Sequence, residues 1–182
     1  MSRGFELKTG RAFGDLRAAL EVTYIDAHYT DTLADGEGNL LVSSGDVLGT
    51  PPLVAAPWNV LATLEQTFTV RGELEARIRA EDAFHSHNDG PFYTGNPGTP
   101  YYAPGLTGDP STNLLNLRAT LDLTRAGWVA HAQQLEIAVF MNNVLDEQPT
   151  LLKRNKGVDV SNLYYATTFR PRTVGLTGTW QF

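Results

Sequence analysis

The 182-residue sequence has no cysteine, no long apolar run and little net charge. The absence of cysteine excludes disulfide bonds and thiolate sites. No apolar stretch approaches the roughly 18 residues that a membrane-spanning helix needs. The net charge of −6 is thinly spread, which argues against a nucleic-acid partner. The first ten residues, MSRGFELKTG, lack the apolar core of a signal peptide. Taken alone, these absences indicate a soluble cytoplasmic protein, an inference that fails if the chain is a piece of something longer.

Signals for catalysis are also missing. No serine has a matching histidine and aspartate in a recognisable motif, and no pair of carboxylates stands out. His85, His87 and Asp89 would share one face of a strand, so a metal site is geometrically possible, but a polar strand end entering a loop explains them better. Asp35, Glu37 and Asp46 lie among glycines at a spacing that fits no standard calcium loop, and a solvated loop explains them better. We therefore expect neither enzymatic activity nor a bound metal or cofactor.

The sequence does contain segments in which polar and apolar residues alternate. The segment TVGLTGTWQF, Thr173–Phe182, divides in steps of two into a polar set and an apolar set. Such a period is typical of a strand whose two faces meet different environments. The apolar set consists of Val174, Leu176, Gly178, Trp180 and Phe182.

Six other stretches alternate in the same way, and together they predict seven antiparallel strands. The connections between them alternate strictly between short and long. This rhythm predicts an up-and-down order, with the short turns at one end of the sheet and the long connections at the other. The other predicted strands are Gly4–Phe13, Leu16–Tyr24, Trp58–Val70, Leu74–Glu81, Leu115–Thr124 and Leu135–Met141.

Two folds could use these strands, a soluble β-sandwich that buries the apolar face or a membrane barrel that turns it to lipid. Alanine and glycine are interspersed among the larger apolar residues, which lipid accommodates more easily than a packed core does. Aromatic residues also stand near the ends of the apolar faces, where a membrane-interface girdle would need them. Both details favour the barrel. These aromatics are Tyr24, Trp58, Phe68, Trp180 and Phe182.

Four segments in order resemble the C-terminal end of TonB-dependent outer-membrane receptors. FMNNVLDEQP, Phe140–Pro149, is similar to the Asn-Asn-hydrophobic-hydrophobic-Asp-Glu segment that ends their penultimate strand. RPRTVGLTGTWQF, Arg170–Phe182, resembles their last strand with its terminal aromatic residue. EVTYIDAHYTDT, Glu21–Thr32, and NLLNLRATLDL, Asn113–Leu123, are similar to earlier strands of the family. The resemblance covers almost the whole chain.

The resemblance implies a fold and a function. The family's barrel has about 22 strands and is filled by an N-terminal plug. Residues 1–182 would be the C-terminal part of this barrel, an antiparallel up-and-down transmembrane segment without plug or signal peptide, and an open curved sheet in isolation. The implied function is ligand-gated uptake of a scarce nutrient, such as an iron–siderophore complex, cobalamin or a glycan. The implied partners are outer-membrane lipid, the TonB complex through the missing N-terminal region, and the barrel-assembly machinery, which would read Trp180 and Phe182.

Ligand contacts are expected in the long connections. Tyr93, Tyr101 and Tyr102 lie in an aromatic-rich stretch that could grip a ligand, with His85 and His87 at its start. A loop packed over its neighbours is the plainer explanation. A basic patch could meet lipopolysaccharide phosphates, although an ordinary solvated loop also explains it. The patch consists of Lys153, Arg154 and Lys156.

Two other classes of protein remain open. A small self-contained outer-membrane barrel would need an even number of strands in a bacterial single chain, and seven is odd. A soluble β-sandwich binding module would bury the leucine rows that a barrel exposes. We expect the barrel arrangement, with four leucines on the convex, outward face: Leu115, Leu117, Leu121 and Leu123.

Overall fold

The computed structural model describes residues 1–48, 56–88, 90–100, 102, 110–124, 133–150, 152–155 and 164–181, with side chains outside 152–155 and 164–167. The described chain is almost entirely β, with one short 3₁₀ turn, η1 (Tyr93–Gly95). Its long strands are β1 (Ser2–Phe13), β2 (Leu16–Ala27), β5 (Trp58–Arg71), β6 (Leu74–His85), β7 (Thr112–Asp122), β8 (Gln134–Asn142) and β11 (Thr173–Gln181).

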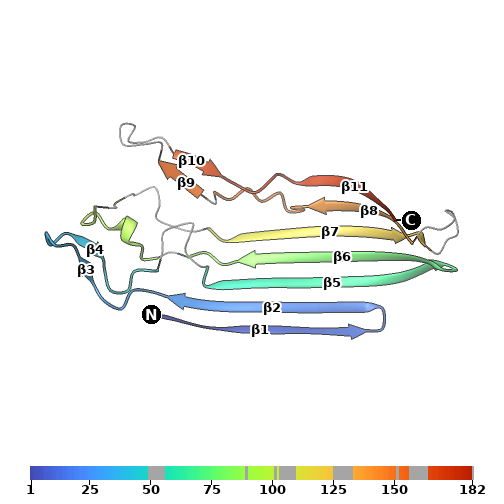
Figure 1. Ribbon diagram of the computed structural model, residues 1–182, viewed down its shortest axis with the longest axis horizontal. Coiled ribbons are helices and arrows are strands. Elements are labelled where there is room, and N and C mark those ends of the chain that lie inside the picture. The colour runs from blue at the N-terminus through green and yellow to red at the C-terminus, as the bar shows by residue number, and fades with distance from the viewer. Residues whose placement is uncertain are drawn as a thin grey trace.

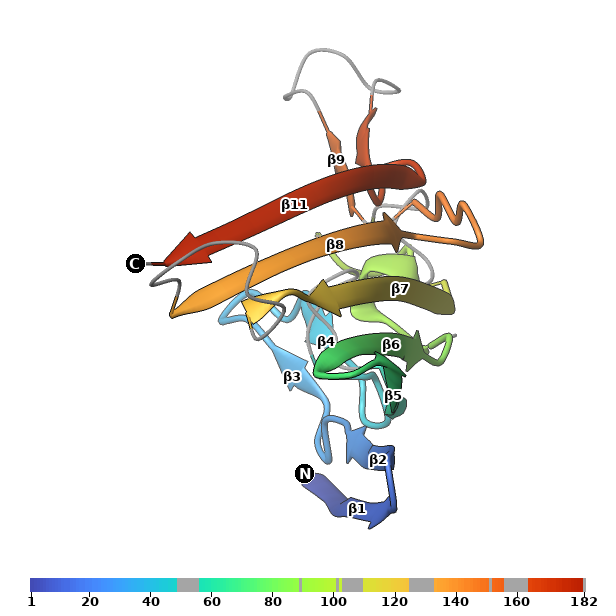
Figure 2. The same cartoon turned by 90° about the vertical axis from the view of Figure 1, so that its right-hand side faces the viewer.

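These seven strands form one antiparallel sheet in the order β1-β2-β5-β6-β7-β8-β11. Each long strand therefore pairs with the long strand that follows it along the chain, and the predicted up-and-down order is confirmed. The sheet is open, because β1 and β11 are not paired with each other. Figure 2 shows how strongly the strands twist from β1 to β11, as the handedness of L-residues requires.

The two ends of the sheet differ. At one end, Gly14 and Gly72 adopt positive φ angles of 61° and 60° in the tight turns that join β1 to β2 and β5 to β6. Glycine suits these positions because it has no Cβ to clash in the left-handed region. We call this the turn end. The long connections leave from the opposite end, which we call the loop end (Figure 1).

The strand registers gather the alternating residues on two continuous faces. Phe5, Tyr24 and Trp58 are aligned on one face, with ring centroids 4.8 to 5.9 Å apart at the loop end. On the same face Leu176 is 70% exposed and Trp180 is 61% exposed at the turn end. Among the described residues, no large side chain is fully buried. The sheet is a single layer, and the described residues leave its apolar face open.

A small packed region lies instead at the loop end. The connection after β2 runs beside β2 itself, with a bridge between His28 and Val47 and a hydrogen bond from the Leu48 N–H to the Ala27 carbonyl. The Val47 N–H donates to the Pro91 carbonyl at 2.7 Å, which ties this connection to the one after β6. The buried apolar side chains of this region are Val42, Ala56 and Phe92.

The structure adds detail that the sequence pattern did not predict. Two short hairpins stand in stretches that we expected to be loops, β3 (Leu33–Ala34) with β4 (Leu40–Val42) and β9 (Leu152–Asn155) with β10 (Tyr164–Thr167). Strands of two to four residues are too short to show a period. Several long strands also extend further toward the loop end, so His85 belongs to β6 and not to the connection after it.

One of the four outward leucines is placed differently from our prediction. Leu115, Leu117 and Leu121 share the apolar face, aligned with Asp82, Ala80 and Ala76 of β6. Leu123 lies beyond the end of β7 and is only 3% exposed, although its N–H still donates to the Leu135 carbonyl. It is therefore buried at the turn end and does not contribute to the open surface.

A candidate binding site on the polar face

A row of side chains crosses the polar face at the middle of the sheet. The pairing partners follow one another from β1 to β11, so the row is set by register alone. Because aligned residues of neighbouring strands have Cβ atoms about 5 Å apart, each member is a direct neighbour of the next. The row consists of Ala12, Arg17, Glu65, Arg79, Arg118, Phe140 and Gly175.

Charges along this row are partly paired. Arg79 donates to Glu81 at 2.7 Å on its own strand and lies 3.9 Å from Glu65. Arg17 also lies 3.9 Å from Glu65, on the opposite side. Arg118 has a different partner, donating to the Thr177 hydroxyl at 3.1 Å, and it forms no ion pair with any described carboxylate. Within the described residues, the charge of Arg118 therefore has no counterion.

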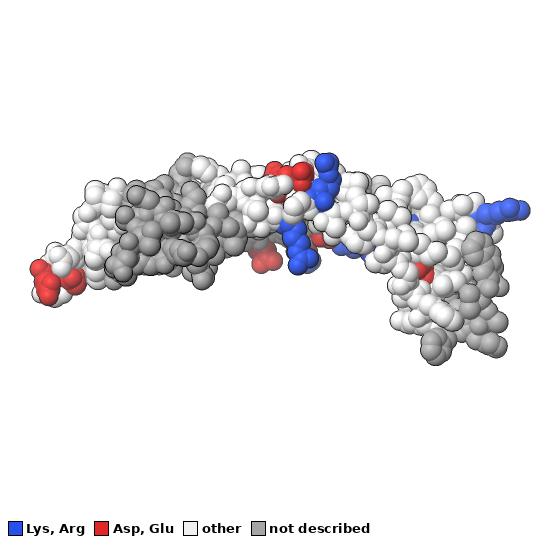
Figure 3. Space-filling view, turned by 90° about the horizontal axis from the view of Figure 1, so that it is seen from above, with Lys and Arg blue, Asp and Glu red and all other residues white. Residues whose placement is uncertain are grey.

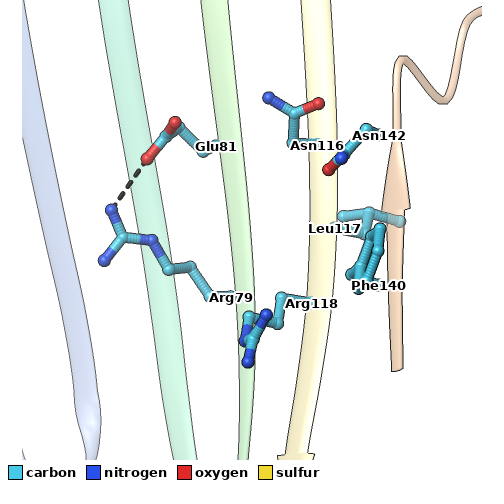
Figure 4. Close-up of a pocket in the computed structure, with 7 residues that line it drawn as sticks. All are labelled: Arg79, Glu81, Asn116, Leu117, Arg118, Phe140 and Asn142. Atoms are coloured by element: carbon cyan, nitrogen blue, oxygen red, sulfur yellow. Dashed lines mark hydrogen bonds and ion pairs between the residues drawn. The ribbon is translucent and has the colours of Figure 1, made fainter. Parts of the chain in front are cut away.

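A hollow of about 310 Å³ lies between this row and the next row toward the loop end. Arg79, Arg118 and Phe140 border it on one side, and Glu81, Asn116 and Asn142 on the other. Figure 4 shows Arg79 turned toward Glu81, whereas Arg118 points away from that carboxylate. Seen from above in Figure 3, charged side chains of both signs stand near mid-length, and an acidic tip marks the end where β3 and β4 lie. The hollow thus combines two guanidinium groups, the Glu81 carboxylate paired with one of them, two amides and an aromatic ring.

The phenyl ring of Phe140 is held by a glycine. A Cβ atom built on Gly175 would lie 2.7 Å from Cε1 of Phe140 and closer still to Cζ, distances that real Cβ contacts essentially never show. The ring therefore lies against the bare backbone of β11, and with any larger residue at this position the end of the Phe140 side chain would have to shift. This contact fixes the wall of the hollow on the side of β8.

A hydrogen-bonded corner positions the loop end of β8. Asn143 is 2% exposed and has a positive φ of 51°. Its Nδ2 donates to the carbonyls of Glu147 and Arg170, both at 2.9 Å, and its Oδ1 accepts from the Glu147 N–H. Its own N–H donates to Oδ1 of Asn116 at 3.0 Å. Asn143 therefore links β7, β8 and the segment that leads into β11, which gives the Asn-Asn motif a structural role.

The neighbouring Asp146 completes this corner. Its carboxylate accepts from the backbone N–H of Arg172 at 2.8 Å. That hydrogen bond, helped by the nearby charge of Arg172, holds the pKa of Asp146 below its usual value. Asp35 behaves alike in the β3–β4 hairpin, where the side chain and N–H of Asn39 lower its pKa. The carboxylate of Asp35 is thus occupied by its own turn.

The predicted loop-end residues do not converge on one site. Tyr93 begins η1, and its carbonyl accepts from the Thr99 hydroxyl, whereas Tyr102 is 47% exposed. His85 is hydrogen-bonded to Asn59 on the polar face. His87 lies two residues further on. Within the part of the chain that the structure describes, no group of three or more acidic or histidine side chains could hold a metal ion. Tyr101, Asp89, Lys156 and Phe182 lie outside the described residues, as do the side chains of Lys153 and Arg154.

Sequence reasoning missed the members of the hollow as a group. Arg79 and Arg118 lie in two of the predicted strands, but the pattern does not show that they are direct neighbours. The tight turn at Gly72 pairs Arg71 with Leu74, and a register shift between Thr69 and Arg71 brings Arg79 opposite Glu65. Counting back from the turn alone would miss this pair by one residue. No such counting applies across the long connection between β6 and β7. Phe140 was noted only as part of a motif, and its partner Gly175 only as a small polar-face residue.

In the described part of the chain, no helix is long and apolar enough to cross a membrane. Comparisons with protein-family profiles, with curated protein sequences and with solved structures found no match to this chain.

Proposed function

We propose that this chain is the C-terminal part of the barrel of a TonB-dependent outer-membrane receptor, which imports a scarce nutrient such as an iron–siderophore complex. The observation that carries this proposal is the asymmetry of the sheet. One face is predominantly apolar over seven strands, interrupted by Arg11 and Asp82, and the other holds ion pairs and a hollow. Lipid would cover the first face, and the second would line the passage for the nutrient.

Two further features support this proposal. The sheet has tight turns at one end and long connections at the other, as barrels of the bacterial outer membrane do. The apolar face also carries aromatic side chains near both of its ends, with Tyr24 and Trp58 at the loop end and Phe68 and Trp180 at the turn end. Rings at these two levels would lie in the two interfacial regions of the bilayer. The narrower assignment, to TonB-dependent receptors in particular, rests on the four segments that resemble that family.

A pair of adjacent positions tests the membrane location. The chain has no cysteine, so a single introduced cysteine can be labelled without labelling any other residue. We expect a fluorophore attached to Leu176→Cys, on the apolar face, to be quenched by a lipid-confined spin label. The same fluorophore on Thr177→Cys, one residue further and on the polar face, should not be quenched. A soluble β-sandwich would leave the protein outside the membrane fraction, and equal quenching at both positions would contradict the assignment of faces.

Uptake is tested separately in cells that make the full-length protein. Cells that contain it should accumulate radiolabelled ferric siderophores in a manner that requires the TonB complex, and cells that lack it should not. Correct membrane location without accumulation of ferric siderophore, cobalamin or glycan would reject the transport assignment. The location would then favour the self-contained structural barrel.

A further inference from the structure

Arg118 is a charge on the polar face that has no counterion among the described residues. It stands directly opposite Arg79 in the β6–β7 register, and like charges that face each other across two strands repel. Arg79 is compensated by Glu81 and Glu65, whereas Arg118 reaches only a neutral hydroxyl. Arg77, two residues before Arg79 on the same face, forms no ion pair or hydrogen bond with the described residues either. The middle of this face is thus locally positive in a chain whose net charge is −6.

The hollow beside Arg118 has the other groups that an organic anion requires. Asn116 Oδ1 is occupied by the N–H of Asn143, so its amide NH₂ group can donate into the hollow. Asn142 contributes a second, exposed amide. Phe140 is aligned with Arg118 and held by Gly175, which provides a rigid apolar wall. The volume of about 310 Å³ matches a small molecule.

We propose that this hollow binds a planar organic carboxylate, with the carboxylate on Arg118 and the planar group against Phe140. A guanidinium fork matches the two oxygens of a carboxylate and forms stronger hydrogen bonds with it than with a neutral oxygen. The bound carboxylate supplies the counterion that Arg118 lacks, on the side away from Glu81, toward which Arg79 is turned (Figure 4). This site follows from the strands of the sheet and does not depend on a membrane location.

A fluorinated probe tests the proposal in non-ionic detergent, which covers the apolar face. We expect 4-fluorobenzoate to bind saturably, seen as a concentration-dependent ¹⁹F shift and line broadening. Its neutral isostere 4-fluorobenzamide has the same ring and shape but no charge, and it should bind at least about tenfold more weakly, since a charge-assisted bond is roughly twice as strong as a neutral one. The absence of saturable binding, or equal binding of both probes, would overturn the proposal.

Two arginine variants distinguish a specific binding site from general electrostatic attraction of anions to the positive face. Arg118→Gln keeps a polar side chain beside Thr177 and should weaken 4-fluorobenzoate binding by about tenfold or more. Arg77→Gln removes the same charge from the same face, but from outside the hollow. It should weaken binding by less than about threefold, because a charge that does not touch the ligand acts on it through the high dielectric constant of water. Equal losses in the two variants would show that the face only attracts anions non-specifically.

Two more variants complete the test. Phe140→Leu should weaken 4-fluorobenzoate binding and keep the preference for the acid over the amide, because it removes the ring and leaves the charge. Arg118→Lys keeps the charge without the fork, and we expect it to bind between the wild type and Arg118→Gln. Folding of each variant is checked by the change in its gel mobility on heating. If Arg118→Gln does not fold, Arg118→Lys takes its place in the test. Full wild-type affinity in Arg118→Lys or in Phe140→Leu would contradict the proposed geometry.

Discussion

Gly175 shows how one missing atom can shape a sheet surface. Its bare backbone accepts the ring of Phe140, and an added Cβ would come within 2.7 Å of Cε1 in that ring. We predict that Gly175→Ala destabilises the protein by up to about 1 kcal/mol, less than the overpacking of a closed core, because the ring of Phe140 lies on an open face and its end can shift. The measurement is the free energy of unfolding in urea, with the protein in lipid vesicles.

Gly178 is the matched control for this substitution. It lies three residues further along the same strand, and nothing within 4 Å would meet an added Cβ there. Gly178→Ala should therefore be neutral or slightly stabilising, because alanine restricts the unfolded chain more than glycine does. A double change, Gly175→Ala with Phe140→Ala, should cost less than the sum of the two single changes. Strict additivity would mean that the ring does not depend on the glycine.

Asn143 has a comparable structural role at the corner after β8. Asn143→Ala removes three side-chain hydrogen bonds and leaves their partners unsatisfied. We predict a loss of about 2–4 kcal/mol in the free energy of unfolding, because each unsatisfied buried group costs about 1–3 kcal/mol and water can recover part of that cost. Asn142→Ala, at the exposed neighbour, should cost less than about 0.5 kcal/mol. Similar losses in both variants would argue against the corner as the source of stability.

At the scale of elements, the same corner makes the connection between β8 and β11 sensitive to acid. The pKa of Asp146 is lower in the folded protein than in the unfolded chain, since the folded carboxylate accepts the Arg172 N–H. Its stabilising effect is therefore present above the unfolded pKa of about 3.9 and is lost as the pH falls through the folded value.

The corresponding prediction concerns the difference between wild type and Asp146→Asn. Wild type should be the more stable protein at pH 7, and the difference should shrink as the pH falls below the unfolded pKa of about 3.9 and then through the lower folded pKa. Thermal unfolding between pH 2 and pH 7 measures it. A constant difference across this range would show that the charge of Asp146 contributes nothing, and that the substituted amide perturbs the turn in another way.

The elements also show how far sequence reasoning reaches. Every long strand was identified from the sequence, because polar and apolar residues alternate over most of its length. They alternate because the two faces of each strand meet different environments. The strand ends were less accurate, since β6 continues to His85 by pairing with Asn59 after its apolar pattern has weakened. The hairpin β3–β4 was missed because it is held by the Asp35 turn and not by a repeated pattern. Leu123 was placed outward because periodicity does not reveal where a strand stops.

The candidate site depends on information that no single strand contains. Arg79, Arg118 and Phe140 meet because two successive registers bring three strands into one row. The first two of these strands are separated by a long connection, whose length says nothing about how the strands align. Residue types alone could thus predict a charged polar face, but not a hollow between two rows.

At the scale of the whole molecule, an open sheet with one apolar face needs an environment that covers this face. The chain must also be delivered to that environment. Trp180 is 61% exposed at the turn end of β11. Phe182, which lies outside the described residues, would follow it on the same face if the alternation continues. Covering one such ring with lipid contributes about 1–2 kcal/mol, at about 25 cal/mol for each Å² buried. A large barrel would not unfold for the loss of that amount.

Recognition during assembly is a different process, because it precedes the finished sheet. If the proposed function holds, the assembly machinery reads the last strand through its terminal aromatic residue. We predict that deletion of Phe182 from the full-length protein lowers the amount in the outer membrane several-fold, whereas the molecules that arrive bind ligand normally. Refolding from urea into detergent, where no machinery is present, should change little. Comparing the amount at the cell surface with the yield of unassisted refolding separates the two roles. Loss of a purely structural residue would impair both equally. Unchanged surface levels would show that Phe182 is not the assembly signal.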